Sequence, residues 1–155
     1  MVFPTETAPK NFGVLDNRFL SRSLGLLNPK PPLTVHESTS IQEALALLRE
    51  HKIGCLVLLN DEDKIAGIFT ERDVVLKVSV CDMSLPETAV STVMTLNPHT
   101  EKMTTSMAFA LNMMSQGGYR HIPIVDDDGF PVGVVSVKDI VDYIVEQLNK
   151  DLARS

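Results

Sequence analysis

The sequence is poor in the residues that mark several large classes of protein. Its 155 residues include two cysteines, no tryptophan and 5% aromatic residues. Cys55 and Cys81 form no CxxC pair, so neither a disulfide framework nor a cysteine zinc site is expected. No apolar run approaches the roughly 20 residues of a membrane-spanning helix. Residues 1–10 lack the basic start and apolar stretch of a secretory signal. We therefore expect a cytoplasmic protein without a membrane span.

Positive charge is also scarce, with 14 Lys and Arg against 20 Asp and Glu and a net charge of −6. This balance argues against bulk attraction to nucleic acid or to an anionic membrane. The four histidines lack metal-ligand spacing, and the acidic stretches 61–63 and 126–128 lack the twelve-residue calcium-loop pattern. No nucleophile and base stand in a recognisable arrangement. We expect no metal site, no catalytic residues and no enzyme activity.

What the sequence does contain is an internal repeat. Residues 67–73 read Gly-Ile-Phe-Thr-Glu-Arg-Asp, and residues 133–139 read Gly-Val-Val-Ser-Val-Lys-Asp, 66 positions later. At the same offset, residues 32–79 align with residues 98–145 without a gap. Two copies of roughly 60 residues indicate a paired module with two equivalent clefts, because a solenoid needs more repeats.

The sequence pattern of each copy predicts the element order β-α-β-β-α. We therefore expect an α/β (α+β) fold. Ser40 and Glu43 fit a capping box, and an i, i+3, i+4, i+7 apolar stripe follows from Ile41. Gly54 and the pair Gly117–Gly118 are expected to end the first helices. The predicted elements are extended segments at 34–36 and 100–102, helices from Ser40 and Ser106, strands at 55–59 and 122–125, hairpin strands at 65–69 and 132–135, and closing helices from about Glu71 and Val137.

The closing helices are expected to bury matched apolar faces, formed by Val74, Val75 and Val78 and by Ile140, Val141 and Ile144. Each copy also begins with a short helical lead-in, where Leu24 and Leu27 align with Val90 and Val93. We expect an arm at 1–19, a first repeat at 20–80, a linker at 81–85, a second repeat at 86–150 and a tail at 151–155.

The repeated Gly-x-x-[Ser/Thr]-x-x-Asp element has two interpretations. In the first, Thr70 and Ser136 are helix caps that Asp73 and Asp139 complete, and nothing more. In the second, the free N–H groups and positive dipole of the helix start hold a phosphate together with the hydroxyl. Each aspartate then accepts hydrogen bonds from two vicinal ribose hydroxyls. The two interpretations are compatible, because a cap can also bind a ligand.

Two segments make the repeat similar to a known family. Residues 67–74 read Gly-Ile-Phe-Thr-Glu-Arg-Asp-Val, and residues 119–136 read Tyr-Arg-His-Ile-Pro-Ile-Val-Asp-Asp-Asp-Gly-Phe-Pro-Val-Gly-Val-Val-Ser. Both copies resemble CBS domains, named after cystathionine β-synthase, over about residues 20–148. The resemblance implies a free-standing pair of CBS repeats, packed as an intramolecular pseudo-two-fold pair. It also implies clefts that bind adenosine-containing ligands: AMP, ADP or ATP ahead of NAD or S-adenosylmethionine.

The resemblance also implies which residues contact the ligand. Those expected to form the phosphate, ribose and adenine contacts are Thr34, Leu56, Val57, Thr70, Asp73, Met94, Thr95, Thr100, Ile122, Pro123, Ser136 and Asp139. Four further residues are expected to offer positive charge to a phosphate, namely Arg72, Arg120, His121 and Lys138. The first copy has Gly54-Cys55 where the second has Arg120-His121, so we expect the second cleft to bind more tightly.

Taken together, these features predict a regulatory module without catalytic activity. An adenine nucleotide in the clefts is expected to change how the module acts on a regulated partner protein. Uncovered apolar faces on the helices predict a homodimer. The alternative is a ligand-free dimerisation or adaptor module in which the repeated motifs serve only as caps. The sequence identifies neither the physiological nucleotide nor the partner.

Overall fold

The computed structural model describes residues 17–154, so residues 1–16 of the expected arm and Ser155 lie outside the described residues. The first repeat has the expected order of elements. These are β1 (Thr34–His36), α2 (Ile41–His51), β2 (Cys55–Leu59), β3 (Ile65–Thr70) and α3 (Glu71–Asp73), which continues as the π-helix η3 (Val74–Val78).

The second repeat follows the same order with one reduction. Its elements are α4 (Met107–Gly117), β5 (His121–Val125), β6 (Pro131–Ser136) and α5 (Val137–Arg154). The extended segment expected at 100–102 shrinks to a single parallel bridge between Glu101 and Ile124. Helix α5 continues through residues 151–154, where a tail was expected. No helix in residues 17–154 is both long and apolar enough to cross a membrane.

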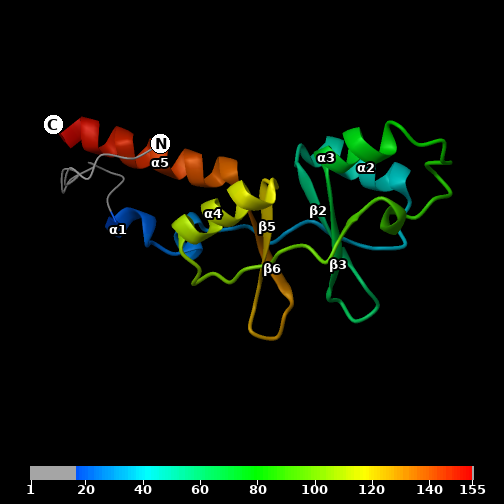
Figure 1. Ribbon diagram of the computed structural model, residues 1–155, viewed down its shortest axis with the longest axis horizontal. Helices are drawn as coiled ribbons and strands as arrows, with labels where there is room; N and C mark the ends of the chain where they lie inside the picture. The colour runs from blue at the N-terminus through cyan, green and yellow to red at the C-terminus, as the bar shows by residue number, and fades with distance from the viewer. Residues whose placement is uncertain (1–16, 155) are drawn as a thin grey trace, which may run out of the picture.

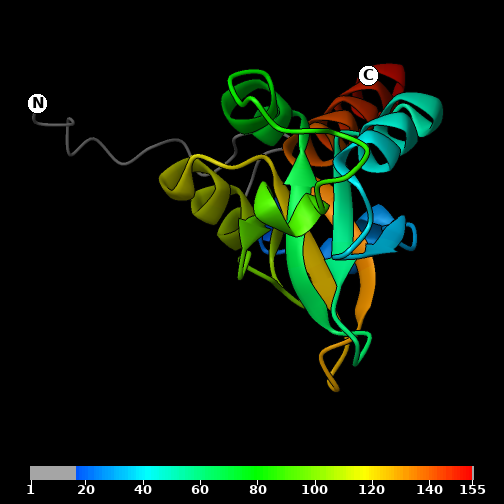
Figure 2. The same ribbon diagram turned by 90° about the vertical axis from the view of Figure 1, so that its right-hand side faces the viewer.

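Each repeat is built on an antiparallel hairpin. Strands β1-β2-β3-β4 form one sheet, in which β4 (Thr95–Leu96) pairs with β3, and β5-β6 form another. Leu58 lies opposite Gly67 and Ile124 lies opposite Gly133, with a register shift just beyond each pair. The two hairpins stand side by side with their tips at the same end of the molecule (Figures 1 and 2). The pair therefore repeats in structure what it repeats in sequence.

The two lead-ins are exchanged between the repeats. The lead-in of the first repeat is α1 (Asn17–Leu20) and the 3-10 helix η2 (Leu24–Leu27), and that of the second is η4 (Val90–Thr92). Leu24, fully buried, packs in the core of the second repeat beside Met107 and Ile122. Val90 packs in the core of the first repeat beside Ile41. Each core is thus completed by a segment that the sequence order places with the other repeat.

The repeats also share an interface of their own. Cys55, Val57 and Ile68 of the first repeat form a third buried cluster, and Val134 of the second packs against it. At the hairpin tips, Lys64 donates to Asp128 O, and its ammonium lies 3.8 Å from the centre of the Phe130 ring. These contacts fix how the two repeats face one another.

Two expectations about the helices are wrong. Helix α2 ends at His51, with Lys52 in the left-handed conformation (φ 52°) as its cap, so Gly54 lies beyond the helix end. Val75 and Val141 are 64% and 46% exposed, although a buried face was expected to include them. In the first repeat, the π-helical turn at 74–78 changes the angular spacing of the valines, so that Val75 turns outward. In the second repeat, the buried face of α5 is narrower than the sequence pattern indicated.

Candidate functional site

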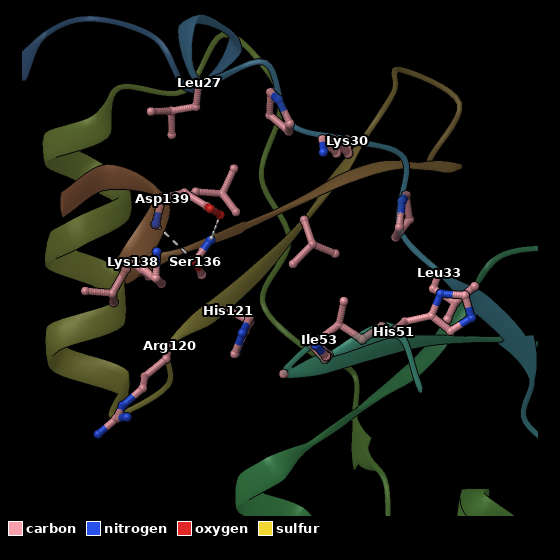
Figure 3. Close-up of a pocket in the computed structure, with 18 of the residues that line it drawn as sticks. Leu27, Lys30, Leu33, His51, Ile53, Arg120, His121, Ser136, Lys138 and Asp139 are labelled. Atoms are coloured by element: carbon pink, nitrogen blue, oxygen red, sulfur yellow. Dashed lines mark hydrogen bonds between the residues drawn. The ribbon is translucent and has the colours of Figure 1, made fainter. Parts of the chain in front are cut away.

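A cavity of about 1290 Å³ lies between the two repeats (Figure 3). The second repeat contributes the start of β5, the end of β6 and the first turn of α5. The first repeat contributes residues 27–33, which lead from η2 into β1, residues 51–55 from the end of α2 to the start of β2, and Glu71. The cavity exists only because the first lead-in crosses to the second repeat before the chain turns back into β1.

At one wall, the strand-to-helix junction of the second repeat carries the repeated motif. Ser136 Oγ accepts from Asp139 N at 3.1 Å, and Ser136 N donates to Asp139 Oδ2 at 2.7 Å. Both halves of a cap are therefore present, as the first interpretation of the motif requires. Asp139 is exposed, and no residue within 17–154 donates a hydrogen bond to its Oδ1. That oxygen is available as an acceptor for a ligand.

Positive charge exceeds negative charge around the cavity, although the chain as a whole is acidic. Lys30, Lys52, Arg120 and Lys138 line it, against Glu71 and Asp139. The expected phosphate cations are not the best placed of these. The Lys138 ammonium pairs with Asp142 Oδ2 at 2.5 Å, and this hydrogen bond raises the pKa of Lys138. Arg120 extends away from Ser136 and Asp139 (Figure 3).

Two lysines that sequence reasoning missed face the same space. Lys30 belongs to the lead-in and Lys52 caps α2, and neither takes part in an ion pair within the described part of the chain. Both come from the first repeat, whereas Ser136 and Asp139 come from the second. The two lysines without ion-pair partners in the described residues therefore lie on the first repeat, and the carboxylate with a free oxygen, Asp139, lies on the second.

His121 sits where the two repeats touch. Its ring packs on Gly54, so closely that a Cβ at Gly54 would lie 3.1 Å from His121 Nε2. Burial lowers the pKa of His121 below its usual value of 6.5, although the charges of Asp139 and Glu71 act in the opposite direction. The lowered pKa favours the neutral form of the His121 imidazole.

The corresponding junction of the first repeat is closed. Thr70 and Asp73 form a reciprocal capping box, and Asp73 is only 4% exposed. Thr95 of β4 donates to Asp73 Oδ1 at 3.0 Å, and Met94 Sδ would lie 2.5 Å from a Cβ at Gly67. Three of the expected ligand contacts, Thr70, Asp73 and Thr95, do come together here, but they bond to one another.

The structure places the remaining expected contact residues away from the cavity. Leu56 and Ile122 are fully buried in the first and second cores, and Val57 lies in the cluster between the repeats. Pro123 is buried opposite Val134. The others are Thr34, which pairs with Val57 along β1, Thr100, which is half-buried, and Arg72, which donates to Gly118 O.

The residues that sequence reasoning missed were within reach of the repeat itself. Met94 and Thr95 were among the expected ligand contacts, and the 66-residue offset maps them onto Asn28 and Pro29. Both of those residues line the cavity. The offset could therefore have predicted Asn28 and Pro29 as cavity residues. No sequence pattern pointed to His51 and Lys52 in the same way.

Comparisons with known proteins agree with this architecture. The CBS domain family matches the chain twice, at residues 27–79 and 90–146. The 17.7 kDa protein in the bps2 3' region of Acidianus ambivalens is 32% identical over 112 residues, which cover 72% of this chain and 66% of that protein. CBSCBSPB1 of Arabidopsis thaliana is 33% identical over 125 residues, 79% of this chain but 23% of its own length. The chain thus spans only part of each relative.

Solved structures of CBS-domain proteins show the same fold, with similar TM-scores and sequence identities. The CBS-domain containing protein ATU1752 from Agrobacterium tumefaciens has a TM-score of 0.72 and 30% identity, covering 79% of this chain and 98% of that one. The CBS domain pair of protein MJ0100 has a TM-score of 0.70 and 27% identity, also covering 79% and 98%. That pair was crystallised in complex with 5'-methylthioadenosine and S-adenosyl-L-methionine.

Proposed function

The chain belongs to the CBS-domain family, and from this premise we propose that it is a regulatory module that binds an adenosine-containing ligand in the cavity between its repeats. CBS-domain proteins are generally regulatory, not catalytic, and a regulatory role is what we propose for this chain. The single observation that carries the proposal is the open carboxylate of Asp139, beside Ser136 at the start of an 18-residue helix, in a cavity between the repeats.

The chemistry of the cavity supports an adenosine ligand. Vicinal ribose hydroxyls are two donors at a fixed spacing, and a carboxylate with a free oxygen is their natural acceptor. The two ligands of the MJ0100 pair share an adenosine moiety with this diol. The same functional group would satisfy Asp139 here, and a ligand that lacks a 2'-hydroxyl would leave part of it without a donor.

The charges support a phosphate-bearing ligand. Lys30 and Lys52 offer ammonium groups without ion-pair partners in residues 17–154, and the helix start beside Ser136 offers backbone N–H groups. We therefore propose AMP, ADP or ATP ahead of NAD and S-adenosylmethionine. A chain of two or three phosphates would extend from the Asp139 wall toward the lysines, so both repeats would contact one ligand.

A ligand held by both repeats would change the balance among their arrangements, and a partner would respond to that change. Exposed apolar side chains on the closing helices, including Val75 and Val145, suit pairing with a second copy. A homodimer, a regulated partner protein and a cytoplasmic location remain part of this proposal.

A thermal-shift screen followed by calorimetry tests the proposal. The compounds are AMP, ADP, ATP, NAD, S-adenosylmethionine and 2'-deoxy-AMP. A ligand at about 100 times its Kd adds about 2.7 kcal/mol of stability, which raises Tm by roughly 5–10 °C for a chain of this size. We expect at least one ribonucleotide to do so, and 2'-deoxy-AMP to bind more weakly than AMP. If no adenosine compound raises Tm, the chain is a ligand-free adaptor and the proposal is wrong.

A further inference from the structure

Both carboxylate oxygens of Asp73 already have partners within the protein. A carboxylate offers about four lone-pair sites. Asp73 Oδ2 accepts from Thr70 N at 2.9 Å and from Thr70 Oγ1 at 3.0 Å. Its Oδ1 accepts from Thr95 Oγ1 at 3.0 Å and forms an ion pair with the Lys77 ammonium at 2.8 Å. A ribose hydroxyl brought to this carboxylate would have to displace Thr70, Thr95 or Lys77, because Asp73 is only 4% exposed.

The Lys77 ammonium is held at this position by three contacts. An ammonium has three N–H donors. The Lys77 ammonium contacts Asp73 Oδ1 at 2.8 Å, and it donates to Val93 O and Met94 O at 3.2 Å each. These two carbonyls come directly before β4, which pairs with β3 on the first repeat. Lys77 therefore ties the segment before β4 to the helix start of the first repeat, through two hydrogen bonds and one ion pair.

The second cleft lacks both of these donors at the matching positions. The 66-residue offset places Tyr143 where the first repeat has Lys77, and Pro29 where it has Thr95. Tyr143 points to other partners: its hydroxyl accepts from Arg22 and its ring stacks on Phe19. Proline has neither a hydroxyl nor a backbone N–H. Two substitutions between the repeats thus account for one closed and one open aspartate.

We propose that Lys77 is a built-in occupant of the first cleft, and that it restricts ligand binding to the second cleft. Its ammonium and the Thr95 hydroxyl hold the acceptors on Asp73 that ligand hydroxyls take on Asp139. Lys77 is in this sense a specificity-determining residue, because it decides how many ligands one chain binds. The inference rests on the proposed function in taking Asp139 as the ribose acceptor.

Calorimetry with AMP and ATP on the wild type and on Lys77→Ala tests it. We expect one site per chain in the wild type and two in Lys77→Ala, with the added site lost again in Lys77→Ala/Asp73→Asn. Lys150→Ala is the matched control, because it removes an ammonium from an exposed i, i+4 pair on α5, with Glu146. We expect this control to keep one site.

The design does not depend on one variant folding. Lys77→Met keeps an unbranched side chain of similar length without N–H donors, and it replaces Lys77→Ala if that protein unfolds. On the wild type, amide NMR shifts upon addition of AMP or ATP should appear at residues 136–140 and not at residues 70–74. Two sites in the wild type, shifts at both junctions, or an unchanged site number in a folded Lys77 variant would each overturn the inference.

The outcomes also separate this inference from the proposed function. If Asp139→Ala leaves the wild-type site intact, the proposed ribose role of Asp139 fails whatever Lys77 does. If the wild type binds nothing but Lys77→Ala binds AMP or ATP, the occupant is confirmed while the second cleft is not a ligand site. If neither protein binds, Lys77 excludes no ligand and the inference is wrong.

Discussion

Replacing the two motif aspartates one at a time should give opposite phenotypes. In Asp73→Ala, Thr95 loses its acceptor and Lys77 loses its ion-pair partner inside the protein. Breaking a buried ion pair by removing one partner costs about 3–5 kcal/mol. The Asp73 side chain is 6% exposed and that of Lys77 is 41% exposed, so water can partly solvate the remaining ammonium. We therefore expect a loss at the low end of that range, about 3 kcal/mol.

In Asp139→Ala, the same chemical change removes only a cap at an exposed helix start. An acidic residue in the first turn contributes about 0.3–1 kcal/mol. Stability should therefore change little, whereas ligand affinity should fall by about 1–3 kcal/mol, the cost of losing a charged hydrogen-bond partner. That loss corresponds to a roughly 5- to 150-fold increase in Kd. The first aspartate would act in stability and the second in binding.

Urea unfolding and calorimetry on the two variants measure both quantities. For a chain of this length, about 1 kcal/mol shifts Tm by 2–4 °C, so Asp73→Ala should lose roughly 6–12 °C and Asp139→Ala about 4 °C at most. Asp73→Ala should bind ligand at the second cleft with wild-type affinity. Equal destabilisation by the two substitutions would refute the reasoning, since it would mean that Lys77 and Thr95 add nothing at Asp73.

Because burial lowers the pKa of His121, its unfolded state binds the proton more tightly, so stability should fall as pH drops from about 6.5 toward the folded-state pKa. His121→Gln should flatten that part of a pH–Tm profile relative to the wild type, and identical profiles would exclude the effect. Light scattering should give twice the 17.1 kDa of one chain, and Val145→Glu should shift the protein toward the monomer; a monomeric wild type at micromolar concentration contradicts this. Gly67→Ala should destabilise by about 1–3 kcal/mol in a urea titration, because its Cβ would lie 2.7 Å from Thr95 O, and an unchanged midpoint would show that β4 moves aside freely.

Much of the fold could be predicted from the sequence because the signals are local. Apolar periodicity from Ile41 and a serine cap at Ser40 specify α2, and Ser40 Oγ indeed accepts from Glu43 N. The short apolar runs and acidic turns specify the hairpins, and both register shifts fall beside the glycines that the repeat marks. The 66-residue offset shows that there are two copies, since that information is held entirely in residue identity.

The candidate site depended on contacts between distant parts of the chain. Leu24 belongs in sequence to the first repeat and in space to the core of the second, and this exchange places Lys30 on the same cavity as Asp139. The motif residues Asp73 and Asp139 are the same in sequence. Asp73 is closed to a ligand by its contacts with Lys77 and Thr95. Asp139 stays open because Tyr143 and Pro29 stand at the matching positions. A motif determines which groups are available at a helix start, but the side chains that tertiary packing brings beside it determine whether those groups remain available to a ligand.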